Sequence, residues 1–178
     1  MTYPIRAATG ADLPAFFAYL NDHLSDNGRD GTALFMPMPR SASGLPPETQ
    51  AGMRNGIGIP VGQPGWRRPW LAFATDGSIA GHVDLRARPE AVSAHRALLG
   101  MGVHRDHRQQ GLGAQLVGVA AAWARDQKIA WIDLDVLSAN APAIALYARC
   151  GFTRTGEMAD LFRIDGTSLA HTFMTRKI

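Results

Sequence analysis

Apolar and polar positions along the chain recur with periods that predict an alternation of strands and helices. Residues 4–7 form a predicted short strand, and a helix follows with Thr9 as N-cap and Asp12 as its capping-box partner. A second helix is predicted over Pro47–Asn55, which has a proline in its first turn. The rest of segment 25–68 is dense in glycine and proline and is predicted as loop. Long loops in compact domains are often functional, so this segment is a candidate to face the substrate, with a variable surface loop as the alternative.

The second half of the chain has clearer periods. The run RPWLAFATDGSIAGHVDLRAR predicts a hairpin, and ALLGMGVH is an apolar run of strand length. Apolar residues at helical spacing then predict a helix over residues 111–127. AWIDLDVL is the next predicted strand, NAPAIALYARCG a helix closed by Gly151, and DLFRIDGTSLAHTFMTRKI a terminal hairpin. This order predicts an α/β fold: a mixed central sheet of about six to seven strands flanked by helices, parallel where the two central helices cross over.

Length and composition narrow the class of protein. A chain of 178 residues fits one domain, so residues 1–178 are predicted as a single unit. No apolar run is long enough to cross a bilayer, the first residues lack the layout of a signal peptide, and Cys150 is the only cysteine. We therefore expect a cytoplasmic protein without a membrane partner. The net charge of +3, spread over short basic clusters, favours a small anionic ligand over nucleic acid.

The stretch VHRDHRQQGLGAQLV, residues 103–117, joins a predicted strand to a predicted helix. Gly111 and Gly113 lack Cβ atoms, so backbone N–H groups can approach a ligand closely at the positive end of the helix dipole. Arg108 adds a forked donor, and together these features are typical of a phosphate site. The spacing matches neither a Walker A loop nor a G-x-G-x-x-G turn. The alternative is that the glycines serve only the turn.

The same stretch, read as GMGVHRDHRQQGLGAQLV, resembles the acetyl-CoA signature of the GCN5-related N-acetyltransferase (GNAT) superfamily. The resemblance continues in LDVLSANAPAIALYARCGF, which is similar to the second block of that superfamily, and the two blocks together span about residues 98–152. The first strand and helix and the terminal hairpin also resemble those of the superfamily. The resemblance implies a GNAT fold whose sheet is splayed at the acetyl-CoA site.

The resemblance also implies a role for each matching residue. The strand before the turn would bind pantetheine, the turn would wrap the pyrophosphate, and Asn140 would bond the pantetheine chain. Tyr147 would bind near the thioester sulfur and protonate the leaving thiolate. The implied acetyl-CoA contacts are Met101, Gly102, Val103, Arg108, Gln109, Gln110, Gly111, Leu112, Gly113, Ala114, Asn140 and Tyr147. The alternative for Asn140 is that it is the N-cap of its helix, a role that can coexist with binding. The alternative for Tyr147 is that it is an ordinary buried tyrosine.

The reaction also needs a base, because an alkylammonium has little free amine at neutral pH. Asp135 is the first candidate, since N-terminal protein acetyltransferases of this superfamily often carry a glutamate, assigned as the base, at the comparable strand position. Aspartate is shorter by one methylene, so a water would relay the proton. Asp133 lies on the same face of the strand as Asp135, because side chains alternate along a strand. The alternative is that one of these two carboxylates merely faces solvent. His82 and Asp84 are the next candidates.

The acceptor is an amine that the sequence does not identify, either a small molecule or a protein amino group. Trp66 and Trp70, at the end of the irregular segment, are candidate substrate contacts, and so is Asp84 in the predicted hairpin. The alternative to an enzyme is a catalytically silent CoA-binding regulatory module of the same fold. A homodimer is open in either case, since two-fold dimers are common among similar proteins. No metal ligand set is expected.

Overall fold

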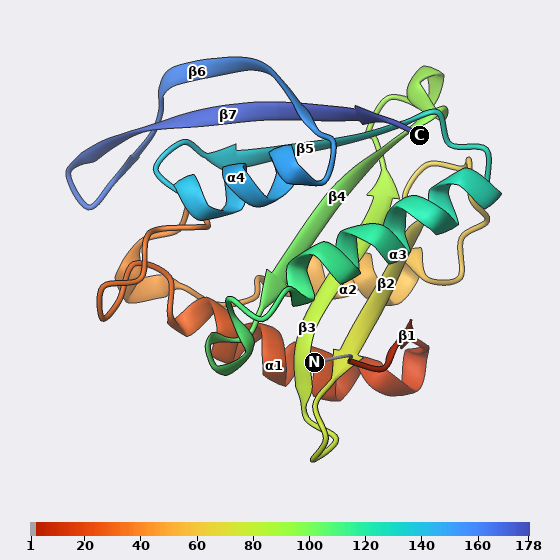
Figure 1. Cartoon of the computed structure of the whole chain (residues 1–178), viewed down its shortest axis with the longest axis horizontal. Coiled ribbons are helices and arrows are strands. Elements are labelled where there is room, and N and C mark those ends of the chain that lie inside the picture. Colours follow the sequence, from red (N-terminus) through yellow and green to blue (C-terminus); the bar gives the residue numbers. More distant parts are fainter. Residues whose placement is uncertain (1–2) are drawn as a thin grey trace.

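A computed structural model describes residues 3–178 and has one seven-stranded mixed sheet with four α-helices (Figure 1). The strands are β1 (Ile5–Ala7), β2 (Arg67–Phe73), β3 (Ile79–Ala87), β4 (Arg96–Val103), β5 (Trp131–Leu137), β6 (Thr153–Ile164) and β7 (Thr167–Lys177). The helices are α1 (Leu13–Ser25), α2 (Pro47–Gly56), α3 (Leu112–Asp126) and α4 (Ala141–Arg149). The predicted α/β class is confirmed, and each predicted helix and strand forms.

The strands lie in the order β1-β2-β3-β4-β5-β7-β6. β1 to β4 are antiparallel neighbours, and β4 pairs with β5 in parallel after the α3 crossover. The second crossover differs from the prediction, because β6 does not pair with β5. β7 lies between them and pairs antiparallel with β5 along the whole of Trp131–Leu137. The long β6–β7 hairpin allows this insertion, since it returns a strand that is long enough to pair with every residue of β5.

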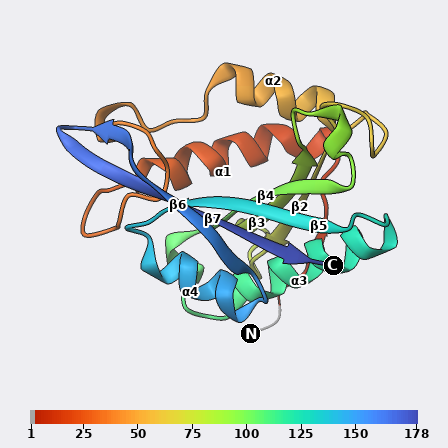
Figure 2. The same cartoon turned by 90° about the horizontal axis from the view of Figure 1, so that it is seen from above.

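The helices cover both faces of the sheet: α3 and α4 lie on one side, and α1 and α2 on the other (Figure 2). Each strand contributes side chains to the apolar layers on both faces of the sheet, because successive side chains point to opposite faces. Ile132, Leu134 and Val136 of β5 join the core under α3, which confirms the predicted face of this strand and leaves Asp133 and Asp135 on the α1 side.

Local signals in the sequence explain where the helices begin and end. Thr9 and Asp12 form the predicted capping box, with the Thr9 N–H donating to the Asp12 carboxylate at 2.8 Å. The Asn140 side chain accepts from the N–H of Ala143 and caps α4. Gly151 follows α4 with φ +85°, a conformation that glycine adopts without strain. The terminal hairpin is longer than predicted: β6 begins at Thr153, and an irregularity between Met158 and Phe162 interrupts its pairing.

Segment 25–68 is organised around Asn27, which is fully buried. Its side-chain amide donates to the carbonyl of Met36 at 3.1 Å and accepts from the N–H groups of Phe35 and Met36. The segment therefore has a defined path outside its helix α2. Within residues 3–178, no helix has both the length and the apolar character needed to cross a membrane.

Candidate functional site

The centre of the sheet opens between its two parallel strands. β4 and β5 pair over only three residues, Arg96–Leu98 against 131–133, although β4 continues to Val103 and β5 to Leu137. Backbone groups of β4 after Leu98 are therefore not matched to β5. Where the two strands separate, groups from both faces of the sheet can meet between them. A continuous sheet would keep the two faces apart.

The predicted phosphate turn follows the end of β4 directly. Gln109 and Gly111 have positive φ values of 60° and 78°, and α3 makes its first helical bond from the Gln115 N–H to the Gly111 carbonyl. The N–H groups of residues 112–114 precede that bond and carry the positive end of the helix dipole. A Cβ at Gly111 would meet no atom within 4 Å, so the turn leaves open space in front of it. This arrangement fits a diphosphate.

Several predicted contacts in this turn also hold the protein together. The Arg108 Nε donates to the Val103 carbonyl at 3.1 Å, and its guanidinium pairs with Asp26 at 3.3 Å. The Gln110 side chain accepts a hydrogen bond from the Tyr3 hydroxyl at 2.7 Å. A Cβ on Gly113 would stand 2.7 Å from Leu146, so this glycine allows α3 and α4 to approach closely.

Tyr147 lies on α4, on the same side of the sheet as α3, and is 8% exposed. Its ring packs edge-on against Phe152 at 5.8 Å. Burial is the main cause that raises the pKa of its hydroxyl well above 10, and the charges of Cys150 and Asp135 act in the same direction. The hydroxyl is therefore protonated at neutral pH and is equipped to donate a proton.

The two carboxylates of β5 lie in different surroundings. Burial opposes the charge on Asp133, but hydrogen bonds from Arg96 and Thr175 outweigh it and lower the pKa of this carboxyl. Asp133 thus belongs to an ion-pair cluster. The Asp135 side chain is 44% exposed and lies 3.6 Å from Nε2 of His171 on β7. Of the two, Asp135 is the carboxylate that water can reach.

The other two candidate bases lie on β3 and are buried. Asp84 is 2% exposed and pairs with Arg67 at 2.7 Å and Arg86 at 3.4 Å. Burial acts against its charge, yet the two arginines outweigh it and lower the pKa of the carboxyl. Burial lowers the pKa of His82 to about 3. Both side chains contact β4 on the face that α1 covers.

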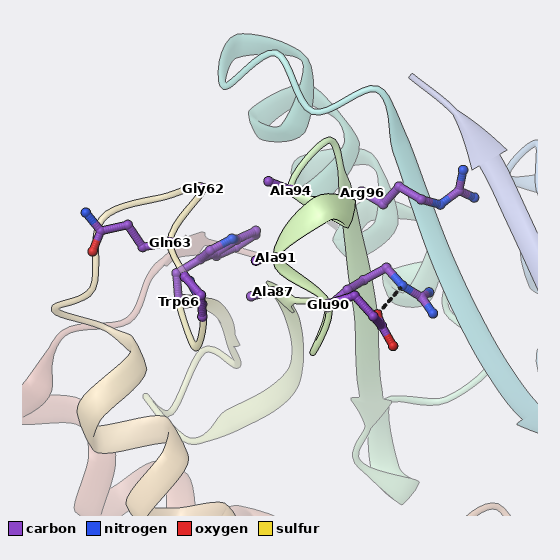
Figure 3. Close-up of a pocket in the computed structure, with 10 residues that line it drawn as sticks. Gly62, Gln63, Trp66, Ala87, Glu90, Ala91, Ala94 and Arg96 are labelled. Carbon is purple, nitrogen blue, oxygen red and sulfur yellow. Dashed lines mark ion pairs between the residues drawn. The ribbon is translucent and has the colours of Figure 1, made fainter.

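Trp66 and Trp70 lie in the core, 1% and 5% exposed, with ring centroids 5.8 and 5.1 Å from that of Trp123 on α3. Their packing leaves little indole surface for a substrate. Figure 3 shows Trp66 on the wall of a pocket between residues 62–66 and 87–96, whose volume of about 10 Å³ suits a single water. A larger cavity of about 310 Å³ lies between α1 and the β2–β3 turn. Neither pocket is lined by the turn 108–114 or by Tyr147.

The sequence did not point to the residues of α1 that contact β4 where it parts from β5. Tyr19 donates a hydrogen bond to the Gly102 carbonyl of β4 at 3.2 Å, and His23 lies against the same glycine. Phe35, from the irregular segment, packs on His23 with ring centroids 4.8 Å apart. The signal was the alternation of Gly100 and Gly102 in a predicted strand, because glycine within a strand marks a close approach by another group.

Comparisons with known proteins identify the family. The family model described as "Acetyltransferase (GNAT) family" matches residues 47–152. The chain is 29% identical over 174 residues to an L-methionine sulfoximine/L-methionine sulfone acetyltransferase of Pseudomonas paraeruginosa, over 98% of this chain and 94% of that protein. It is 31% identical over 87 residues to a streptothricin acetyltransferase of Escherichia coli, and that match spans about half of each protein, 49% of this chain and 47% of the relative.

A solved structure has the same fold. It is a GNAT superfamily phosphinothricin acetyltransferase (Pat) from Sinorhizobium meliloti in complex with AcCoA, with a TM-score of 0.79. The superposition covers 100% of this chain and 89% of that one at 20% sequence identity. At this identity the likeness concerns the fold.

Proposed function

Because the chain belongs to the GNAT family of acetyltransferases, we propose that it transfers the acetyl group of acetyl-CoA to a primary amine of a small molecule, by direct attack in a ternary complex. The observation that carries the proposal is the parting of β4 from β5 beside the glycine turn. It lets a donor and an acceptor meet from opposite faces of the sheet.

Acetyl-CoA supplies the thioester, and the chain supplies its binding groups. The β4 backbone at Met101–Val103 binds pantetheine, and the N–H groups at the start of α3, with Arg108, bind the pyrophosphate. The fit rests on the open space before Gly111 and on the N–H groups of residues 112–114, which precede the first helical bond of α3. Asn140 uses its side-chain oxygen as a cap, so its amide N–H groups remain donors for the pantetheine chain.

The proton transfers use residues on both faces of β5. Asp135, exposed on the α1 side, removes a proton from the incoming ammonium group through a water. Tyr147, buried on the α3 side, gives its proton to the departing thiolate. Burial raises the pKa of Tyr147, so the hydroxyl is protonated at neutral pH and has a proton to give, but it is also a weaker acid than a free tyrosine. Solvent then returns the proton to Tyr147.

A small acceptor is favoured over a protein for two reasons. The relative that aligns over 98% of this chain is named for L-methionine sulfoximine and L-methionine sulfone, which are amino-acid analogues. In addition, segment 25–68 packs over the α1 side of the sheet: Leu34 belongs to one buried cluster with Leu137 of β5, and Phe35 packs on the ring of His23 of α1. We therefore propose that this segment faces the acceptor.

Two assays test the proposal. Isothermal titration should detect binding of acetyl-CoA, and no binding at millimolar concentration would contradict it. Thiol release should then be measured with L-methionine sulfone, phosphinothricin, streptothricin and a peptide with a free N-terminus. Release with the small amines alone supports the proposal, and release with the peptide alone overturns the acceptor class. Binding without release for any amine would instead favour the silent CoA-binding module.

A further inference from the structure

One buried carboxylate of β3 faces two arginines. The Asp84 side chain is 2% exposed and pairs with Arg67 at 2.7 Å and with Arg86 at 3.4 Å. Arg67 makes the closer contact, so the single negative charge of Asp84 is already matched before Arg86 is counted. Among residues 3–178, Asp84 is the one carboxylate that pairs with the Arg86 guanidinium, although this group has five N–H donors. The described part of the chain therefore leaves the positive charge of Arg86 unbalanced.

The neighbouring ion pairs do not supply the missing anion. Arg88 and Arg96 both pair with Asp133. Arg88 also lies 3.5 Å from a carboxylate oxygen of Glu90, so two arginines there face two carboxylates. The excess positive charge thus stays at Arg86. Its side chain is 34% exposed, so a ligand from solvent can reach the guanidinium.

The guanidinium of Arg86 reaches over β4 because Gly100 has no side chain. Leu85 points into the core under α3, so its neighbour Arg86 points to the α1 side of the sheet. A Cβ on Gly100 would stand only 3.0 Å from Nη1 of Arg86. Gly100 lies two residues beyond Leu98, the last residue of β4 that pairs with β5. Arg86 thus brings its charge from β3 to the place where β4 and β5 part.

Asp135 has the matching position on β5. Leu98 pairs with Asp133, so Gly100 and Asp135 each lie two residues beyond the last pair and on the same face. Paired strands lie about 4.8 Å apart, which separates β3 from β5 by about 10 Å across β4. Leu98 and Gly100, between the two charges, are partly exposed, and the Asp135 side chain is 44% exposed. A cation and a carboxylate that solvent can reach therefore flank the same stretch of β4.

We propose that Arg86 binds the carboxylate of the acceptor and that the acceptor is an α-amino acid. This inference rests on the proposed function and narrows its acceptor class. A zwitterion satisfies both charges: its carboxylate receives parallel N–H donors from the planar guanidinium, and its ammonium group lies toward Asp135, which takes a proton through a water. Hydrogen bonds of about 2.8 Å at each end extend so small a molecule to the order of the strand separation. The proposed pyrophosphate site lies at α3, on the opposite side of the sheet, so Arg86 serves the acceptor and not the donor.

The test compares an Arg86→Gln variant with a matched Arg154→Gln control, because Arg154 is 52% exposed and pairs with Glu157 on β6. Two acceptors are used with each protein. One is L-methionine sulfone, and the other is 3-(methylsulfonyl)propan-1-amine, which has the same amine and sulfone without the carboxylate. Because Arg67 keeps the closer pair with Asp84, the melting temperature of Arg86→Gln and its affinity for acetyl-CoA should match those of the control.

With L-methionine sulfone, Arg86→Gln should raise KM on the order of 10- to 100-fold with little change in kcat, the loss expected when charged hydrogen bonds are removed. With the amine that lacks the carboxylate, its KM should equal that of wild type. Arg86→Lys should recover part of the loss, because lysine keeps the charge without the planar fork. Arg154→Gln should behave as wild type with both amines.

Each result bears on the inference. An unchanged KM of Arg86→Gln for L-methionine sulfone overturns it, and so does an equal rise in KM for both amines. A wild type that acetylates both amines equally well also overturns it, whether or not the variant folds, but leaves the proposed function standing. If the wild type binds acetyl-CoA and acetylates neither amine, the acceptor class proposed above is wrong and the inference falls with it. A rise in KM confined to L-methionine sulfone supports both.

Discussion

Acidification should destabilise this protein first by protonating His23 and His82 in the unfolded state. Protonation of the carboxylates lowers the stability only at lower pH. Both imidazoles are buried, and burial lowers the pKa of His23 to about 4 and that of His82 to about 3, against 6.5 in the unfolded chain. Between these values the unfolded state binds more protons than the folded state. Stability is therefore full above about pH 6.5 and decreases as the pH falls toward 4 and 3.

The size of the effect follows from linkage. At pH 5.0 an unfolded histidine is mostly protonated, about 1.5 pH units below its pKa, while both folded imidazoles remain mostly neutral. Each unit corresponds to about 1.36 kcal/mol, so each histidine lowers the free energy of unfolding by about 2 kcal/mol between pH 7.5 and 5.0. The two together give about 4 kcal/mol, a large share of the stability of a typical domain.

Urea unfolding followed by tryptophan fluorescence measures this directly, since Trp66 and Trp70 are buried. The free energy of unfolding of the wild type should be lower at pH 5.0 than at pH 7.5, and His23→Gln should remove about half of the difference. His95→Gln, at an exposed position, should keep all of it. A wild-type stability that is equal at both pH values, or a His23→Gln variant as sensitive as wild type, would refute the assigned burial of these imidazoles.

Three further substitutions test the site and its frame. Tyr147→Phe should lower kcat by about 10² or more with unchanged acetyl-CoA affinity in titration calorimetry, and undiminished turnover would remove the general-acid role. Asp133→Asn removes the anion that pairs with Arg96 and leaves Arg88 with Glu90 alone, so it should cost about 3 kcal/mol in urea unfolding, whereas a cost near zero would mean that the pairs are solvated. Gly111→Ala meets no neighbour but must adopt φ +78°, so a loss of about 1 kcal/mol is expected from backbone strain alone, and no loss would show that the turn rearranges.

Much of the frame of the site could be predicted from local sequence. The capping box at Thr9 and Asp12, the cap at Asn140 and the glycine after α4 all formed as predicted. So did the strand ending at Val103 and the glycine turn that follows it. These features depend on residues within a few positions of each other.

Other parts of the site could not be predicted this way. Asp133 and Asp135 share a face and are two residues apart, yet one is locked by arginines from distant strands and the other is reached by water. Trp66 and Trp70 adjoin a loop in sequence, but Trp123 of α3 covers them in the fold. Each outcome depends on which distant element packs against the residue.

By itself the sequence determined the helices, the strands, the glycine turn and the resemblance to a family, because capping, periodicity and glycine conformations act locally. Only the tertiary structure decided that β7 inserts beside β5, that β4 and β5 part after three pairs, and that α1 places His23 at Gly102. The Tyr19–His82 hydrogen bond beside that contact joins residues 63 positions apart. Long-range packing of this kind sets the burial and the charge of each group, and with them its chemistry.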